Sequence, residues 1–163
     1  MSNFVKPVDR YPECFVCGDR NPVGLKIEFF YDGETAFAEF TPGRSYEGYR
    51  TVCHGGILAS VLDEVMVKAV LAEGRVTVTG RLEIRYRRPA WTGELLRAEG
   101  RVTRRRGRVL ETEGRITDPG GAVICEGSAS YCEVRDEHLR GLMTGSGDGG
   151  RDPAADPSPP AKP

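Results

Sequence analysis

The stretch HGGILASVLDEVMVKAVLAEG, residues 54–74, predicts the element around which the rest of the chain folds. Its apolar residues point in nearly every direction when they are placed on a helical wheel. A helix that is apolar on most sides is buried on most sides. Gly74 stands where helices commonly end in a left-handed conformation. We therefore expect a largely buried helix over residues 55–73.

Shorter segments with strand-like patterns flank this helix. Two precede it, separated by Asp32-Gly33, a pair that favours a β-hairpin. Four follow it, divided by glycine and proline residues, and the run from Leu82 to Tyr86 alternates apolar inward and charged outward residues. The expected strands cover residues 25–31, 34–40, 76–88, 94–105, 108–117 and 122–134, with a loop over 41–53. This order predicts an α+β fold, with a largely antiparallel sheet packed on one long central helix.

The composition is typical of a single globular domain. The chain has 163 residues, of which 39% are hydrophobic and 29% are charged, and its net charge is −1. No apolar run approaches the roughly 18 residues of a membrane span, and the first residues lack the apolar segment of a secretory signal. A net charge near zero argues against a protein that binds nucleic acids without sequence specificity. We expect a cytoplasmic protein that binds neither membrane nor nucleic acid.

Composition also divides the chain into three regions. From residue 141 onward the sequence is rich in Gly, Pro, Asp and Ser and has almost no apolar periodicity, which predicts disorder. We expect an N-terminal extension over residues 1–10, a folded domain over 11–140 and a disordered tail over 141–163.

The predicted helix carries an isolated carboxylate, Asp63. Its neighbours on the wheel are apolar, and no cation follows it three or four residues later. Desolvation should raise the pKa of such a carboxyl, which is typical of a general base or nucleophile. The alternative is that Asp63 only accepts a hydrogen bond from a backbone group or a nearby hydroxyl. Glu64 and Lys68, in contrast, are predicted to form an ordinary ion pair at the surface.

The helix begins at His54-Gly55-Gly56, which is the second chemical feature. Accessible N–H groups and the helix dipole make such a start a candidate anion site or oxyanion hole. Gly55 and Asp63 lie about 12 Å apart along a helix, whereas one reacting carbonyl would need each within about 3 Å. If both act on one substrate, they come from two chains, and a homodimer with paired interface sites is predicted.

These residues resemble the hotdog-fold acyl-CoA thioesterases of the PaaI-like, phenylacetate-pathway group. The shared pattern is Glu47-Gly48-Tyr49, then His54-Gly55-Gly56, then Asp63, followed by a strand that ends in Tyr86-Arg87-Arg88-Pro89. The resemblance covers about residues 14–134. It implies a hotdog fold, a homodimer or homotetramer, no cofactor, and hydrolysis of an acyl-CoA thioester to a free acid and coenzyme A.

The resemblance also implies a role for each site residue. Asp63 would activate water or attack the thioester carbonyl, and the Gly55 N–H of the facing chain would polarise the carbonyl oxygen. Gly56 would let the acyl group approach the backbone, His54 would shape the helix start, and Thr79 would orient the carboxylate or the water. Arg87 and Arg88 lie where basic residues of the family tend to meet the phosphates of coenzyme A, a ligand suited to arginine. Arg104, Arg105 and Arg106 are further candidates for these phosphates, and their placement depends on the dimer or tetramer geometry.

Two other functions stay open. A non-catalytic module that holds an acyl-CoA or another acyl carrier would keep the same arginines and an apolar tunnel. A dehydratase generally needs a catalytic histidine, and only His54 and His138 are present.

Cys14 and Cys17 supply half of the ligand spacing of a zinc site, but the other cysteines are scattered singly. We therefore expect a buried or half-buried turn there, and no metal.

Overall fold

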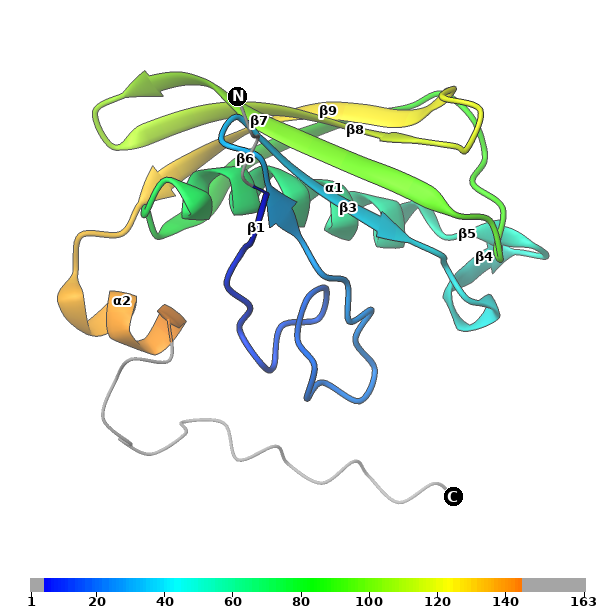
Figure 1. The fold of residues 1–163 in the computed structure, drawn as a ribbon, viewed down its shortest axis with the longest axis horizontal. Coiled ribbons are helices and arrows are strands. Elements are labelled where there is room, and N and C mark those ends of the chain that lie inside the picture. Colours follow the sequence, from blue (N-terminus) through cyan, green and yellow to red (C-terminus); the bar gives the residue numbers. More distant parts are fainter. Residues whose placement is uncertain (1–4, 145–163) are drawn as a thin grey trace.

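The computed structural model describes residues 5–144, and in it one curved antiparallel sheet lies against the long helix α1 (Gly55–Ala72) (Figure 1). The predicted α+β architecture is confirmed. The sheet has seven strands, in the spatial order β1 (Lys6–Pro7), β2 (Phe30–Tyr31), β3 (Thr35–Phe40), β7 (Leu96–Arg106), β8 (Val109–Thr117), β9 (Val123–Glu133) and β6 (Thr77–Tyr86). The strand β6 therefore forms one edge of the sheet and pairs only with β9.

A row of glycines lets α1 lie close to the centre of the sheet. Gly100, Gly114 and Gly127 are direct neighbours across β7, β8 and β9. A Cβ atom on Gly100 would lie 2.9 Å from the carbonyl oxygen of Val65, and one on Gly114 would lie 2.9 Å from Cγ of Met66. Such distances are shorter than real Cβ contacts, so larger residues here would push the helix away from the sheet.

The N-terminal segment covers the opposite side of α1. It runs below the helix in Figure 1 and contributes Val8, Val16, Cys17, Ile27 and Phe29 to the core. Backbone hydrogen bonds fix it, from Val8 N to Phe29 O and from Ile27 N to Val16 O, both 2.9 Å long. The helix is thus enclosed by the sheet and by this segment, as its apolar pattern predicts.

This covering segment corrects one prediction. The Glu64–Lys68 pair is not at the surface, because the Lys68 side chain is only 3% exposed and that of Glu64 is 15% exposed. The two charged groups lie 3.3 Å apart, and Lys68 Nζ also donates a hydrogen bond to the backbone oxygen of Asp9. The sequence did not show that residues 8–29 would lie over this face of the helix.

Other differences concern short elements and the ends of the domain. Most of residues 25–31 is irregular, and the predicted loop 41–53 holds a 3₁₀ turn (Arg44–Tyr46) and the two-stranded sheet of β4 (Glu47–Tyr49) and β5 (Val52–Cys53). The strand β1 lies in the expected extension, and the helix α2 (Glu137–Thr144) continues past residue 140. The rest of the predicted tail, 145–163, lies outside the described residues. Neither α1 nor α2 is long and apolar enough to span a membrane.

Candidate active site

Two hydroxyl groups hold the carboxylate of Asp63 on the side of α1 that faces β6 and β9. The Tyr131 hydroxyl donates to Oδ1 at 2.8 Å, and it also lies 2.9 Å from the backbone oxygen of Asp63. Thr79 Oγ1 lies 3.2 Å from Oδ1 and 3.3 Å from Oδ2. Thr79 and Tyr131 are direct cross-strand partners, so both side chains stand on the sheet face that meets α1.

A β-bulge at Gly80 places Thr79 on that face. The pairing of β6 with β9 shifts between Thr79 and Arg81, which leaves Gly80 as the extra residue. Leu82 is expected on the inner face of the sheet, and successive side chains of a regular strand alternate between the two faces. Without a bulge, Thr79 would therefore point to the outer face. The bulge reverses the alternation, so Thr79 can reach the carboxylate of Asp63.

Burial raises the pKa of Asp63 above the ordinary aspartate value, and the negative charge of Glu64 acts in the same direction. The hydrogen bonds from Tyr131 and Thr79 lower that pKa but do not cancel the effect of burial. The predicted upward shift is therefore confirmed, and so is the hydrogen bonding expected from the alternative interpretation. Burial also raises the pKa of Tyr131, so its hydroxyl stays protonated and remains a donor to the carboxylate.

The two carboxylate oxygens of Asp63 are not equivalent. Oδ1 accepts hydrogen bonds from both Tyr131 and Thr79, whereas Oδ2 has only the longer contact with Thr79. An ionised carboxylate oxygen can accept more than one hydrogen bond. Oδ2 is thus the oxygen with capacity for a water molecule or for direct attack on a substrate.

The start of α1 forms a second polar centre. His54 is the N-cap residue, and its Nδ1 accepts a hydrogen bond from the Gly56 N–H at 2.8 Å. The Tyr86 hydroxyl, at the end of β6, donates to the Gly55 carbonyl oxygen at 2.7 Å. Within residues 5–144, no acceptor is bonded to the Gly55 N–H. The positive end of the helix dipole therefore presents one unused donor at Gly55.

One chain keeps these two centres apart. Gly55 and Asp63 are separated by about two turns of α1. The Asp63 centre lies near the Thr79 end of β6, and the helix start lies near its Tyr86 end. The chain has a groove of about 750 Å³ on the outer face of the sheet and another of about 500 Å³ beside Phe30, and neither is lined by Asp63 or Gly55. The structure thus brings Thr79 to Asp63 but does not bring Gly55 to them.

The predicted coenzyme A residues fall into two groups. Arg87 and Arg88 follow β6 beside the helix start, and Arg87 forms an ion pair with Glu126 at 2.5 Å. Arg104, Arg105 and Arg106 are the last three residues of β7. Arg105 there contacts Glu73, near the last turn of α1. Arg88, Arg104 and Arg106 are exposed and form no ion pair within the described part of the chain. The two groups therefore lie toward opposite ends of the helix.

Sequence reasoning missed Tyr131 as a site residue. The alternation of Ala129 and Tyr131 in β9 could have placed both side chains on the inner face of the sheet. Nothing local indicates that Tyr131 lies over Asp63, because the two residues are 68 positions apart and meet only through the strand register.

Comparisons with known proteins agree with this architecture. Residues 51–125 match the family model described as the thioesterase superfamily. A solved thioesterase superfamily protein superposes with a TM-score of 0.71 at 25% identity, over 74% of this chain and 60% of that chain. The E. coli PaaI protein of the phenylacetic acid degradation operon superposes with a TM-score of 0.64 at 21% identity, over 68% of this chain and 80% of that chain.

A hypothetical thioesterase of Streptococcus pneumoniae TIGR4, solved with coenzyme A, superposes with a TM-score of 0.60 at 19% identity, over 62% of this chain and 79% of that chain. The sequence has no significant match among the curated proteins. The chain therefore has the hotdog fold, as the resemblance implied. The match to the thioesterase superfamily model covers residues 51–125, which contain the whole of α1 and Thr79.

Proposed function

We propose that the protein hydrolyses an acyl-CoA thioester to a free acid and coenzyme A, and that it does so as a homodimer. The observation that carries the proposal is the Asp63 carboxylate. It is held by two hydroxyls on a largely buried helix, its pKa is raised, and one of its oxygens has spare capacity. A general base or nucleophile needs these properties.

In the proposed reaction, ionised Asp63 accepts a proton from a water molecule as the water oxygen attacks the thioester carbon. The carbonyl oxygen becomes an oxyanion, and the N–H of the partner subunit's Gly55 stabilises it. When the tetrahedral intermediate collapses, the C–S bond breaks and the coenzyme A thiolate takes the proton from Asp63. In the variant by direct attack, an Asp63 oxygen bonds to the acyl carbon, the C–S bond breaks and coenzyme A leaves as the thiolate, so that a mixed anhydride forms. Water then hydrolyses the anhydride to the free acid and ionised Asp63, and the proton released neutralises the thiolate.

The edge strand β6 supports the proposed dimer. It is ten residues long, contains no proline and pairs on one side only, so its other side offers free backbone groups to a second chain. Next to it, α1 carries a partly exposed stripe of mostly small residues that includes Ala59, Ser60 and Asp63. Antiparallel pairing of two β6 strands about a two-fold axis near Glu83 would bring the Tyr86 end of one to the Thr79 end of the other.

This arrangement would complete the site. Tyr86 is bonded to Gly55 and Thr79 is bonded to Asp63. The helix start of one chain would therefore stand beside the carboxylate of its partner. His54 would keep the N-terminal turn in shape through its bond to Gly56, and Thr79 would orient Asp63 toward the attacking water.

Coenzyme A recognition is proposed for the exposed arginines. Arg88 is the first candidate, because it lies beside the helix start and has no carboxylate partner within residues 5–144. Arg87 would exchange Glu126 for a phosphate, and Arg105 would exchange Glu73. Arg104 and Arg106 would bind from a second subunit. Structures of the Streptococcus pneumoniae protein and of a Bacillus halodurans protein contain coenzyme A, which supports this ligand.

The test measures release of free coenzyme A from a panel of acyl-CoAs, from acetyl to long-chain and aromatic acyl groups, by chromatography. A matched pair of variants then examines the oxyanion donor. Gly55→Pro removes the N–H at a position where proline suits a helix start, and His54 already has the extended backbone that must precede proline (φ −62°, ψ 134°). Gly55→Ala keeps the N–H, and its Cβ would lie 3.5 Å from the Tyr86 ring.

We expect turnover with a clear acyl preference, a loss of about 10²- to 10³-fold in kcat for Gly55→Pro, and near-parental kcat for Gly55→Ala. Equal losses in the two variants would refute the oxyanion role of the Gly55 N–H. Tight binding of an acyl-CoA without turnover by the folded dimer would refute the hydrolase and identify the non-catalytic acyl-CoA module instead.

A further inference from the structure

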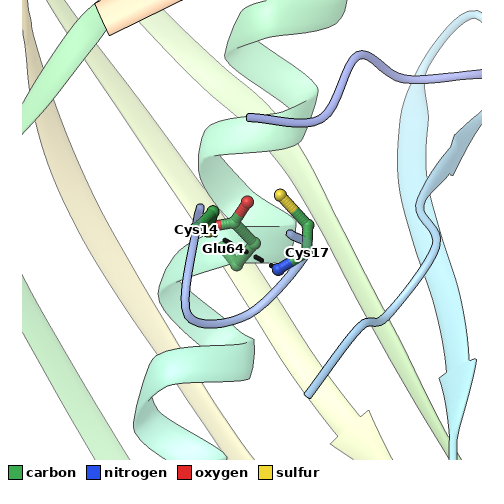
Figure 2. Close-up of side chains that lie close together, drawn as sticks. All are labelled: Cys14, Cys17 and Glu64. Carbon is green, nitrogen blue, oxygen red and sulfur yellow. Dashed lines mark hydrogen bonds between the residues drawn. The ribbon is translucent and has the colours of Figure 1, made fainter. Parts of the chain in front are cut away.

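A second cluster of reactive groups lies on the other side of α1 from the proposed active site. Cys14 and Cys17 belong to the N-terminal segment and Glu64 belongs to the helix, and Figure 2 shows the three side chains side by side. Their two sulfurs and a carboxylate oxygen all lie within 4.8 Å of one another. Within the described part of the chain, no other group of at least three potential metal ligands converges in this way.

The loop that carries the two cysteines is shaped for a thiolate. The N–H groups of Val16 and Cys17 both point at Cys14 Sγ, at 3.4 and 3.5 Å, and the Gly18 N–H closes the turn on the Cys14 carbonyl oxygen at 2.9 Å. A Cβ atom on Gly18 would lie 2.3 Å from the backbone oxygen of Pro12, so only glycine fits after the second cysteine. The turn thereby holds the two sulfurs on the same side.

The spacing of these groups is close to that of a tetrahedral zinc site. With Zn–S bonds near 2.3 Å and Zn–O bonds near 2.1 Å, tetrahedral angles place two sulfurs about 3.8 Å apart and a sulfur and an oxygen about 3.6 Å apart. Cys14 Sγ lies 3.8 Å from Glu64 Oε2. The remaining separations are at most 4.8 Å. They need to shorten by no more than about 1.2 Å, which a loop side chain can supply by small rotations.

The buried charge of Lys68 fits a bound dication with these ligands. Two thiolates and Glu64 carry three negative charges, which Zn²⁺ and the Lys68 ammonium together balance. Lys68 Nζ lies 3.3 Å from Glu64 Oε1, the carboxylate oxygen that does not face Cys14. Lys68 would therefore orient Glu64 from the outer shell and leave Oε2 free to bind the metal.

We propose that Cys14, Cys17 and Glu64 bind one zinc ion, with a water molecule as the fourth ligand. Binding releases the protons of the two thiols, and the metal joins the N-terminal segment to α1 at the residue next to Asp63. The sequence contained only two ligands at suitable spacing, and the third comes from a residue 50 positions away. The proposal is independent of the thioesterase reaction.

The test uses the full chain, reduced and freed of metal, and titrates it with Co²⁺ while thiolate-to-cobalt charge-transfer absorption is recorded. Zn²⁺ affinity is then measured by competition with a chromophoric chelator. We expect one equivalent of metal per chain, and loss of the charge-transfer band in Cys14→Ser and in Cys17→Ser. Cys132→Ser, which changes an exposed cysteine outside the cluster, should bind as the parent does.

Glu64→Gln separates this site from a simple thiol pair. It keeps both sulfurs, so the band should persist while Zn²⁺ affinity falls at least tenfold. Circular dichroism of each variant checks that the fold is retained. Three results would each overturn the proposal: no stoichiometric band in the reduced parent, a band that survives in Cys14→Ser, or unchanged Zn²⁺ affinity in Glu64→Gln. A Cys14–Cys17 disulfide in a protein that binds no metal after reduction would identify a redox pair in place of the zinc site.

Discussion

Replacement of Tyr131 by phenylalanine tests the electrostatics of the proposed base directly. The change removes the hydroxyl that donates to Asp63 Oδ1 at 2.8 Å and leaves the ring in the core. That hydrogen bond favours the ionised carboxylate and lowers the pKa of Asp63, so its loss raises the pKa further. The acid limb of kcat/KM should therefore move to higher pH in Tyr131→Phe.

The size of the effect follows from the kind of hydrogen bond. A bond to a charged acceptor contributes about 1.5–3 kcal/mol, which corresponds to a roughly tenfold to hundredfold smaller ionised fraction at a fixed pH on the acid limb. The Tyr131 hydroxyl also contacts the backbone oxygen of Asp63, so we expect the lower end of this range. On the alkaline side, where Asp63 is ionised in both proteins, kcat/KM should return toward the parental value.

The assay is the pH profile of kcat/KM for the best acyl-CoA, with the concentration of free coenzyme A followed by chromatography. Tyr31→Phe is the matched control, because it removes a buried tyrosine hydroxyl that donates to Gly33, at the far side of the sheet. Its profile should overlie that of the parent. An acid limb of Tyr131→Phe that stays in place or moves to lower pH would refute Asp63 as the titrating base.

Three further predictions concern the helix and its contacts. Asp63→Asn should lower kcat by about 10²- to 10⁴-fold. It should also be more stable than the parent at neutral pH. Because the pKa of Asp63 is raised on folding, the parent loses stability as pH rises through that pKa, and the asparagine variant does not. Melting temperatures of both proteins, measured against pH, would show this difference. Glu64→Gln should keep most of its turnover, since Glu64 faces Lys68, and steady-state kinetics would check this. Gly114→Ala should reduce the free energy of unfolding in urea by about 1–3 kcal/mol, whereas Gly43→Ala, which meets no atom within 4 Å, should change little.

The fold could be predicted from the sequence where the signal is local. The helix was expected over residues 55–73 and is observed over Gly55–Ala72, and the four strands after it agree closely with the alternation of their residues. The first expected strand fails because Lys26 adopts a left-handed conformation (φ 56°), which interrupts an extended chain. Lysine carries no sequence signal for that conformation, so the interruption was not predictable.

The candidate site could be predicted only in part. The apolar surroundings of Asp63 are encoded along one helix, and the upward shift of its pKa follows from them. Its two hydroxyl partners depend on strand register. Thr79 reaches Asp63 only because the bulge at Gly80 reverses the alternation, and Tyr131 reaches it only because β9 pairs with β6 in this register. The position of Lys68 depends in the same way on the N-terminal segment, because its partner Asp9 lies 59 positions earlier in the chain.

The proposed sharing of each site between two chains makes a quantitative prediction for mixed dimers. Asp63→Asn and Gly55→Pro should each be nearly inactive alone. In a heterodimer of the two, one site combines the intact Asp63 of the proline variant with the intact Gly55 N–H of the asparagine variant, and the other site lacks both. Random exchange of subunits makes about half of the dimers heterodimers, so about a quarter of all sites should be active.

Recovery of roughly a quarter of the parental activity after unfolding and joint refolding would therefore show that the carboxylate and the helix start come from different chains. If one chain supplied both groups to a site, every site in the mixture would lack one of them, and no activity would return. The separation along α1 favours the first outcome, because about 12 Å of helix lies between Gly55 and Asp63 and neither residue can move along it. Co-refolding of Asp63→Asn with Gly55→Ala is the positive control, since the alanine chain keeps its N–H and should restore at least as much activity.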